Sequence, residues 1–341
     1  MAERLEDIAA KMVTRGKGIL AADESAGTIK KRFDSIGLDS TADNRRDYRE
    51  MLFRTDEAMR NYISGVILYD ETLRQEAADG TPLVDIIKAS GAVPGIKVDM
   101  GAKELALCPG EKVTEGLDGL RERLGEYYRL GARFAKWRAV IDINDTLPSR
   151  CGIAANAHAL ARYAALCQEA GIVPIVEPEV LMDGNHTIER CMQVSEAVLN
   201  AVFDELYLNR VRLEGTVLKP NMVVSGKMCA KQAGVEEVAE KTLTVFRRAV
   251  PAAVAGIAFL SGGQSDADAT AHLSAMNAMG GALPWPLTFS YGRALQAAPL
   301  AAWGGRKENV AAGQRALLHR AHMNGLASKG EWKPELERKA A

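Results

Sequence analysis

The chain has 341 residues, of which 47% are hydrophobic and 26% are charged. This composition is ordinary for a globular protein, and it excludes an intrinsically disordered chain, which has too few apolar residues to form a core. The formal net charge is −1, from 43 Lys and Arg against 44 Asp and Glu, and no basic cluster stands out. We therefore expect no nucleic acid among the partners of this protein, because nucleic-acid-binding domains carry a basic patch or a basic excess.

The pattern of apolar residues and cysteines predicts the compartment. The longest apolar run, residues 252–260, contains a glycine and has 9 residues, whereas a membrane-spanning helix needs about 20. The acidic N-terminus lacks the apolar core of a signal peptide. The 5 cysteines are an odd number without a C-x-x-C pair, which argues against a disulfide framework and against a zinc ribbon. These features predict a cytoplasmic protein with no membrane partner.

Eight short segments rich in β-branched and other apolar residues are predicted to be strands. In chain order they are Gly18–Glu24, Ser64–Asp70, Gly95–Asp99, Phe134–Ile141, Ile172–Val180, Val217–Met222, Ala255–Gly263 and Leu287–Gly292. Their starts lie 31 to 46 residues apart, which is too far for hairpins and suits strand–helix–strand units.

Helical periodicity fills several of the intervals between these strands. Three apolar stripes have helical spacing: Leu117, Leu120, Leu124 and Tyr127; Ile188, Cys191, Val194, Val198 and Val202; and Val235, Val238, Thr242, Val245 and Phe246. Ser265 followed by Asp268 is typical of a capping box that begins a helix after the seventh strand.

The order of the predicted elements indicates the fold. No Pro- or Ser-rich linker divides the chain, so eight parallel strands alternating with helices predict one α/β domain, a (β/α)8 TIM barrel spanning residues 1–341. We expect a short frayed tail from about residue 331 to the end. The alternative, an open doubly wound sheet, normally carries G-x-G-x-x-G after its first strand, and this motif is absent there.

Charged residues interrupt the predicted strands where a core would be apolar. They are Asp23, Lys97, Asp99, Lys136, Arg138, Glu177, Glu179 and Lys219. Residues two apart in a strand share a face, and in a barrel that face is the interior near the C-terminal strand ends, where barrel enzymes carry their catalytic groups. Any single one could instead lie in a solvated loop, and a lone lysine such as Lys219 is often a surface residue. Repetition from strand to strand favours one shared site.

The types of residue in these segments predict an anionic substrate and amine chemistry. Counting Arg293, five cations face three carboxylates, those of Asp23, Glu177 and Glu179. Ser-Gly-Gly at 261–263 and Ser-Tyr-Gly-Arg at 290–293 end the last two strands, where barrels commonly bind phosphate. A lysine near another cation loses its proton more easily and can attack a carbonyl to form an imine, which then permits cleavage of the neighbouring C–C bond. The spacing does not say which lysine attacks.

Seven segments, in order, closely resemble class I fructose-bisphosphate aldolase. They are GILAADES (18–25), GIKVD (95–99), FAKWR (134–138), VPIVEPE (173–179), LKPNM (218–222), FLSGGQS (259–265) and FSYGRALQ (289–296), and the resemblance extends from about residue 5 to about residue 330. It implies a metal-independent Schiff-base lyase without a cofactor. The family members are (β/α)8 barrels, usually homotetramers, and cleave fructose 1,6-bisphosphate into dihydroxyacetone phosphate and glyceraldehyde 3-phosphate.

The resemblance also implies a role for individual residues. Lys219 would form the imine, and Glu177 would be the general acid and base of that step. Lys136 would be the neighbouring cation, and Asp23 would hold the C4 hydroxyl and assist cleavage. The remaining matched positions are Arg293, Ser261, Gly262 and Gly292 at the C1 phosphate, Lys97, Arg138, Ser25 and Arg32 at the substrate and its C6 phosphate, and Glu179 as a carboxylate near the lysines.

One feature departs from the family pattern, and two other functions stay open. Many members end in a tyrosine credited with proton transfer at C3 of the ketose, whereas the last tyrosine here is Tyr291.

A sugar-phosphate isomerase or epimerase would leave three interior lysines without a role, and a non-catalytic interaction protein could use the same fold. No histidine stands at a predicted strand end, so we expect no three-histidine zinc site.

Overall fold

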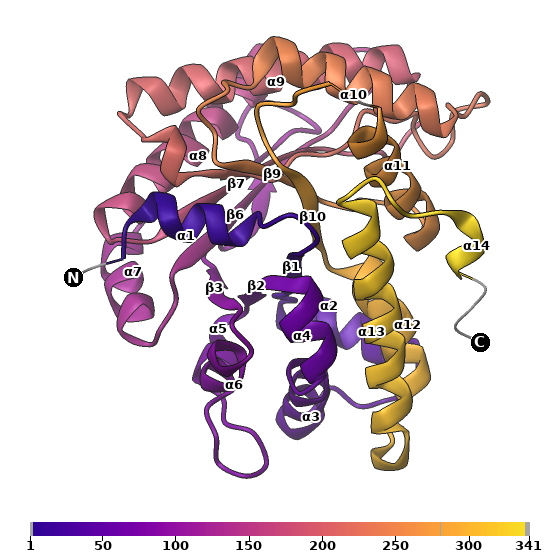
Figure 1. Cartoon of the computed structure of the whole chain (residues 1–341). Coiled ribbons are helices and arrows are strands. Elements are labelled where there is room, and N and C mark those ends of the chain that lie inside the picture. The colour runs from indigo at the N-terminus through magenta and orange to yellow at the C-terminus, as the bar shows by residue number, and fades with distance from the viewer. Residues whose placement is uncertain (1–2, 280, 338–341) are drawn as a thin grey trace.

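The computed structural model describes residues 3–279 and 281–337, and its centre is a closed barrel of eight parallel strands (Figure 1). Around the barrel the strands follow the order β1 (Gly18–Ala22), β10 (Leu287–Tyr291), β9 (Gly256–Phe259), β8 (Val217–Leu218), β7 (Val173–Val180), β6 (Phe134–Ile141), β3 (Val93–Lys97) and β2 (Ile63–Leu68). β1 pairs with both β10 and β2, which closes the ring. The predicted TIM barrel is therefore confirmed.

Every predicted strand is present, and β6 has the predicted ends, but other boundaries differ. β1 ends at Ala22 and β8 ends at Leu218, so Asp23 and Lys219 lie one residue beyond their strands. The prediction made these strands too long because an apolar run does not stop where strand pairing stops. Met222 and Val223, for example, are buried although they lie beyond β8.

Helices form the outer layer of the barrel. They are α2 (Ala26–Asp34), α3 (Ala42–Phe53), α4 (Asp56–Tyr62), α5 (Asp70–Arg74), α6 (Leu83–Ala89), α7 (Leu120–Arg129), α8 (Arg150–Glu169), α9 (Ile188–Leu208), α10 (Val235–Ala249), α11 (Asp266–Ala278), α12 (Arg293–Trp303) and α13 (Val310–Ala327). The predicted apolar stripes are the buried faces of α7, α9 and α10, except that Leu117 and Val235 are only half-buried. The Ser265 hydroxyl accepts a hydrogen bond from the Asp268 N–H, which confirms the predicted N-cap of α11.

A small hairpin after β3 was not predicted. It pairs β4 (Ala102–Glu104) with the antiparallel β5 (Lys112–Thr114) and lies outside the barrel sheet. Its strands have only three residues each, which is too short for alternation of apolar and polar residues to be recognised.

The N-terminal end of the barrel is closed by the helix α1 (Leu5–Met12). Its apolar face packs on residues at the starts of the strands, which form one buried cluster with it. The barrel members of this cluster are Ile19, Ala21, Ile67, Val93, Phe134, Val173, Ile175, Val217 and Ala258. Because apolar side chains fill the barrel interior at this end, we expect the polar site of the barrel at its opposite end.

The C-terminal segment is more ordered than expected. Residues 334–337 form the short helix α14 (Pro334–Glu337), and the carboxylate of Glu337 accepts hydrogen bonds from Arg320 at 2.7 Å and from Trp332 at 3.1 Å. The expectation of a frayed tail from about residue 331 is wrong for residues 331–337, because buried Arg320 requires a carboxylate partner. The rest of that tail, 338–341, lies outside the described residues.

Candidate active site

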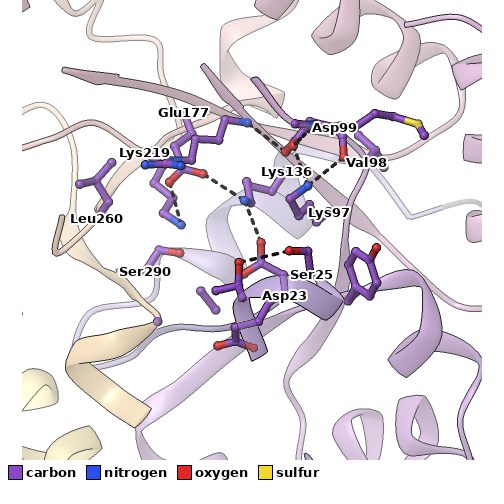
Figure 2. A pocket seen from close by; sticks show the side chains of 18 of the residues that line it. Asp23, Ser25, Lys97, Val98, Asp99, Lys136, Glu177, Lys219, Leu260 and Ser290 are labelled. Carbon is purple, nitrogen blue, oxygen red and sulfur yellow. Dashed lines mark hydrogen bonds and ion pairs between the residues drawn. The ribbon is translucent and has the colours of Figure 1, made fainter. Parts of the chain in front are cut away.

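An open cavity of about 870 Å³ lies at the C-terminal ends of the strands (Figure 2). All of the site residues predicted from the sequence line it: Asp23, Ser25, Arg32, Lys97, Lys136, Arg138, Glu177, Glu179, Lys219, Ser261, Gly262, Gly292 and Arg293. These residues come from segments far apart in the chain, and the closed ring of strands brings them to one place.

The centre of the cavity is a cluster of two lysines and two carboxylates. Lys136 Nζ lies 2.7 Å from Asp23 Oδ2 and 3.5 Å from Glu177 Oε2. The other oxygen of Glu177 lies 3.2 Å from Lys219 Nζ. Figure 2 shows Lys136 between the two carboxylates, and Lys136, Glu177 and Lys219 are buried. Glu177 thus links the two amines.

Burial and the neighbouring charges act in opposite directions on this cluster. Burial by itself would raise the pKa of Asp23, but the positive charges of Lys136 and Lys219 outweigh it and lower that pKa to about 2. Burial would likewise lower the pKa of Lys136, but Asp23, followed by Glu177, outweighs it and raises that pKa well above its usual value. At neutral pH the cluster therefore contains an ionised Asp23 and a protonated Lys136.

A second set of ion pairs lies on β3, β6 and β7. Arg138 Nε lies 2.5 Å from Glu179 Oε2, and Lys97 Nζ lies 2.6 Å from Asp99 Oδ1. Burial would lower the pKa of Arg138, but Glu179 outweighs it and raises that pKa. Glu179 was expected near the lysines, yet its ion pair among the described residues is with Arg138. The side chain of Arg138 is 41% exposed, so this pair lies at the rim of the cavity.

The loops after β9 and β10 have the form of an anion site. Gly292 is the N-cap residue of α12, whose first N–H groups are free of partners within the helix. Gly262 has a φ of +52°, a left-handed conformation that favours glycine. Arg293 donates a hydrogen bond to the carbonyl oxygen of Gln264, which anchors its guanidinium beside this loop.

Arg32 lies close to Gly292, at the start of α12. A Cβ built on Gly292 would lie 3.5 Å from Arg32 Nη2. Arg32 lies on α2, which follows β1, and β1 is the neighbour of β10 in the ring. Ser25, the N-cap residue of α2, is on the same side, and its hydroxyl lies 3.1 Å from that of Thr28.

The prediction missed three residues behind Arg32. The carboxylate of Glu24 lies 2.5 Å from Arg32, 2.7 Å from Arg49 and 2.8 Å from Gln296. Glu24 and Gln296 lie within two of the segments that carry the family resemblance, which was a usable signal. Arg49 lies in the middle of α3, outside every recognised segment, and only the structure reveals that it is buried.

The described residues contain neither a cluster of metal-ligating side chains nor a helix that could span a membrane. Within residues 3–279 and 281–337, no three or more His, Cys, Asp or Glu side chains are grouped so that they could hold a metal ion. In the same part of the chain, no helix combines the length and the apolar character that crossing a bilayer requires. Metal independence remains a prediction.

The whole chain is similar to one known family. Residues 4–341 match the model of the family described as fructose-bisphosphate aldolase class-I. A probable fructose-bisphosphate aldolase class 1 of Xanthomonas axonopodis pv. citri is 57% identical over 97% of this chain and 99% of its own length. The muscle-type fructose-bisphosphate aldolase of Lethenteron camtschaticum is 53% identical over 97% of this chain and 92% of its own length.

A solved structure agrees with these relatives. Fructose-bisphosphate aldolase from Plasmodium falciparum, determined in complex with TRAP and a small-molecule inhibitor, superposes with a TM-score of 0.94. The two chains are 50% identical, and the match covers 97% of this chain and 96% of that one. The family match, the two relatives and the solved structure all agree with a barrel that holds a cavity of lysines and carboxylates. The chain therefore belongs to the class I fructose-bisphosphate aldolase family.

Proposed function

We propose that this aldolase cleaves fructose 1,6-bisphosphate through an imine between Lys219 and C2 of the sugar. The observation that carries the proposal is the contact of 3.2 Å between Lys219 Nζ and Glu177 Oε1 in a buried setting. An amine must lose its proton before it can attack a carbonyl, and Glu177 is placed to accept that proton. Lys136, on the other oxygen of Glu177, keeps the carboxylate in place.

The remaining steps follow from the same cluster. Attack of Lys219 on C2 gives a carbinolamine, and Glu177 returns its proton to the departing C2 oxygen, which leaves as water and gives an iminium. Ionised Asp23 accepts the proton of the C4 hydroxyl as the C3–C4 bond breaks. The bonding electrons move to the iminium, which becomes an enamine, and C4 leaves as the aldehyde of glyceraldehyde 3-phosphate. Protonation at C3 and addition of water then release dihydroxyacetone phosphate and free Lys219.

The strand order supports a bound position for both phosphates. In the ring of eight strands, β9 and β10 lie opposite β6 and β3. We propose that the loops of β9 and β10, with Arg293, Ser261, Gly262 and Gly292, bind the C1 phosphate, and that Lys97 and Arg138 face the C6 phosphate. β8 and β7, which carry Lys219 and Glu177, lie between these two sides, so the carbonyl is held near the amine.

Borohydride trapping tests the proposal directly. Borohydride added in the presence of dihydroxyacetone phosphate should reduce the iminium to a stable secondary amine, and peptide mapping should place the added mass on Lys219. An adduct on Lys97 or Lys136 would assign the nucleophile to that residue instead. Complete absence of an adduct during turnover would contradict imine chemistry.

We also propose that the enzyme is a cytoplasmic homotetramer, as its family resemblance implies. Tyr207 and Leu208 at the end of α9 are 82% and 69% exposed, and large exposed apolar residues of this kind are frequent in subunit contacts. Light scattering coupled to gel filtration should give four times the chain mass of 36.8 kDa. A mass of one chain at micromolar concentration would contradict the tetramer.

A further inference from the structure

Three charged side chains form a chain of ion pairs that runs from the cavity into the protein. The carboxylate of Glu24 lies between two guanidinium groups, 2.5 Å from Arg32 Nη1 and 2.7 Å from Arg49 Nη2. The side chain of Arg32 is 23% exposed, whereas those of Glu24 and Arg49 are 3% and 2% exposed. Arg32 and Glu24 line the cavity, while Arg49 lies behind them on α3.

This arrangement decides the charge that Arg32 presents to a ligand. Arg32 and Glu24 alone would be a neutral pair, and a neutral pair attracts phosphate weakly. With Arg49 included, the three groups carry one net positive charge. Since the side chains of Glu24 and Arg49 are almost fully buried, water screens the interaction between them only weakly. The net positive charge of the three groups therefore acts on a ligand through Arg32, which is the exposed group.

The group is held rigidly at the end of β1. Arg49 Nε donates a hydrogen bond of 3.1 Å to the carbonyl oxygen of Ala22, and Gln296 Nε2 donates one of 2.6 Å to that of Ala21. Gln296 also donates to Glu24 at 2.8 Å, so α3 and α12 both hold the carboxylate. Among the described residues, the buried Arg49 Nη1 has no hydrogen-bond partner, and an unsatisfied buried donor has an energetic cost.

We propose that Arg49 is a positioning residue for substrate binding: by neutralising Glu24 it leaves the charge of Arg32 free to bind a substrate phosphate beside Gly292. Arg49 itself does not touch the substrate. The inference rests on the proposed function, because it requires a phosphate to occupy the loop after β10. It assigns a role in binding to a residue that no motif of the sequence indicates.

A double-mutant cycle that removes the buried charges tests this role. In Arg49→Met, Glu24 neutralises Arg32, and KM for fructose 1,6-bisphosphate should rise by about 10-fold or more, the value of one charge-assisted hydrogen bond, with a smaller change in kcat. In the double variant Glu24→Gln/Arg49→Met the net positive charge is restored, and KM should return to within about 3-fold of wild type. Replacing buried ionic groups together is often tolerated, so the double variant is expected to fold.

Two further variants separate charge from structure. Arg49→Lys keeps the buried positive charge and should keep KM near the wild-type value. Arg46→Met is the matched control, because it removes an arginine of the same helix that pairs with Asp43 and Asp47 away from the cavity. If Arg49→Met does not fold, Arg49→Gln takes its place, because it also removes the buried positive charge while Glu24 stays, and the same rise in KM is expected.

The outcomes distinguish this inference from the proposed function. An unchanged KM in Arg49→Met, or a double variant that binds as weakly as Arg49→Met, would overturn the role of Arg49. Borohydride trapping on Lys219 at saturating dihydroxyacetone phosphate should succeed in all of these variants. Loss of trapping in the wild type would instead refute the imine, whatever the KM values are.

Discussion

The two ends of the barrel are built from the same strands and differ in what their inner faces carry. At the N-terminal end, Phe134 of β6 and Val173 of β7 belong to an apolar cluster that α1 closes. Two residues further along the same face of β6 comes Lys136, and along β7 the inner face continues from Ile175 to Glu177. The inner face thus changes from apolar to charged within a few residues. This change divides the barrel into an apolar end closed by α1, here called the floor, and a reactive cavity.

This difference shows how the fold separates stability from reactivity. The floor removes apolar surface from water and lowers the local dielectric beneath the charged cluster, which strengthens every ion pair above it. Isolated charges in that position would be strongly unfavourable, so the lysines are paired with Asp23 and Glu177. Variants at the floor should therefore change stability, and variants in the cavity should change catalysis.

The sharpest test of the cavity is Lys219→Met. A neutral side chain of similar length removes the nucleophile and leaves the packing nearly intact, so cleavage should fall by about 10⁴-fold or more while the melting temperature stays near that of wild type. Steady-state kinetics and thermal unfolding measure the two effects. Cleavage by this variant at the wild-type rate would move the nucleophile to another lysine.

Glu177→Gln should have the next largest effect. The amide keeps the shape of the carboxylate but cannot carry protons, so imine formation should slow by about 10² to 10⁴-fold. Single-turnover trapping with borohydride measures this step directly. Equal trapping rates in variant and wild type would show that another group carries the proton.

Phe134→Ala tests the closed end of the barrel. Phe134 is fully buried, and its ring fills the space that a Cβ on Gly95 would enter. Removing the ring should reduce the free energy of unfolding by about 3–5 kcal/mol, while kcat/KM of the folded fraction stays close to wild type. Urea unfolding provides the measurement. A large loss of kcat/KM in folded protein would mean that the floor also positions Lys136.

The depressed pKa of Asp23 predicts a smaller, pH-dependent effect. Its pKa is about 2 in the folded protein and 3.8 as the unperturbed value, so the ionised form stabilises the fold by about 2 kcal/mol above pH 4 or so. This contribution is lost as the pH falls toward 2. The stability advantage of wild type over Asp23→Asn should therefore shrink from neutral to acid pH, and a constant difference would contradict the depressed pKa.

The smallest effect is expected from a chelator. If an iminium on Lys219 withdraws the electrons that the C–C cleavage releases, as proposed, no metal is needed and EDTA should leave kcat unchanged. Loss of activity that zinc restores would show that a metal takes part. Unchanged activity would mean that the charged residues of the cavity suffice for the reaction.

The number and chain order of the barrel strands, and the charged residues at their ends, could be predicted from the sequence alone, whereas the β4–β5 hairpin could not. Alternation of apolar and charged residues at 134–138 and 173–179 is a local pattern, and two-residue periodicity places such residues on one face. The seven family segments then indicated the aldolase function, which the relatives bear out against the isomerase and the interaction protein. These inferences succeeded because they depend only on residues close together in the chain.

Which of these residues come into contact depends on the tertiary structure. The pairing of Lys136 with Asp23 joins residues that are far apart in the sequence, and so does the pairing of Arg49 with Glu24. The closure of the floor by α1 likewise joins segments far apart in the chain, and the ion pair of Glu337 with Arg320 joins α14 to the preceding helix α13. No local pattern encodes such contacts, because they depend on how the ring closes and on which buried charge still lacks a partner.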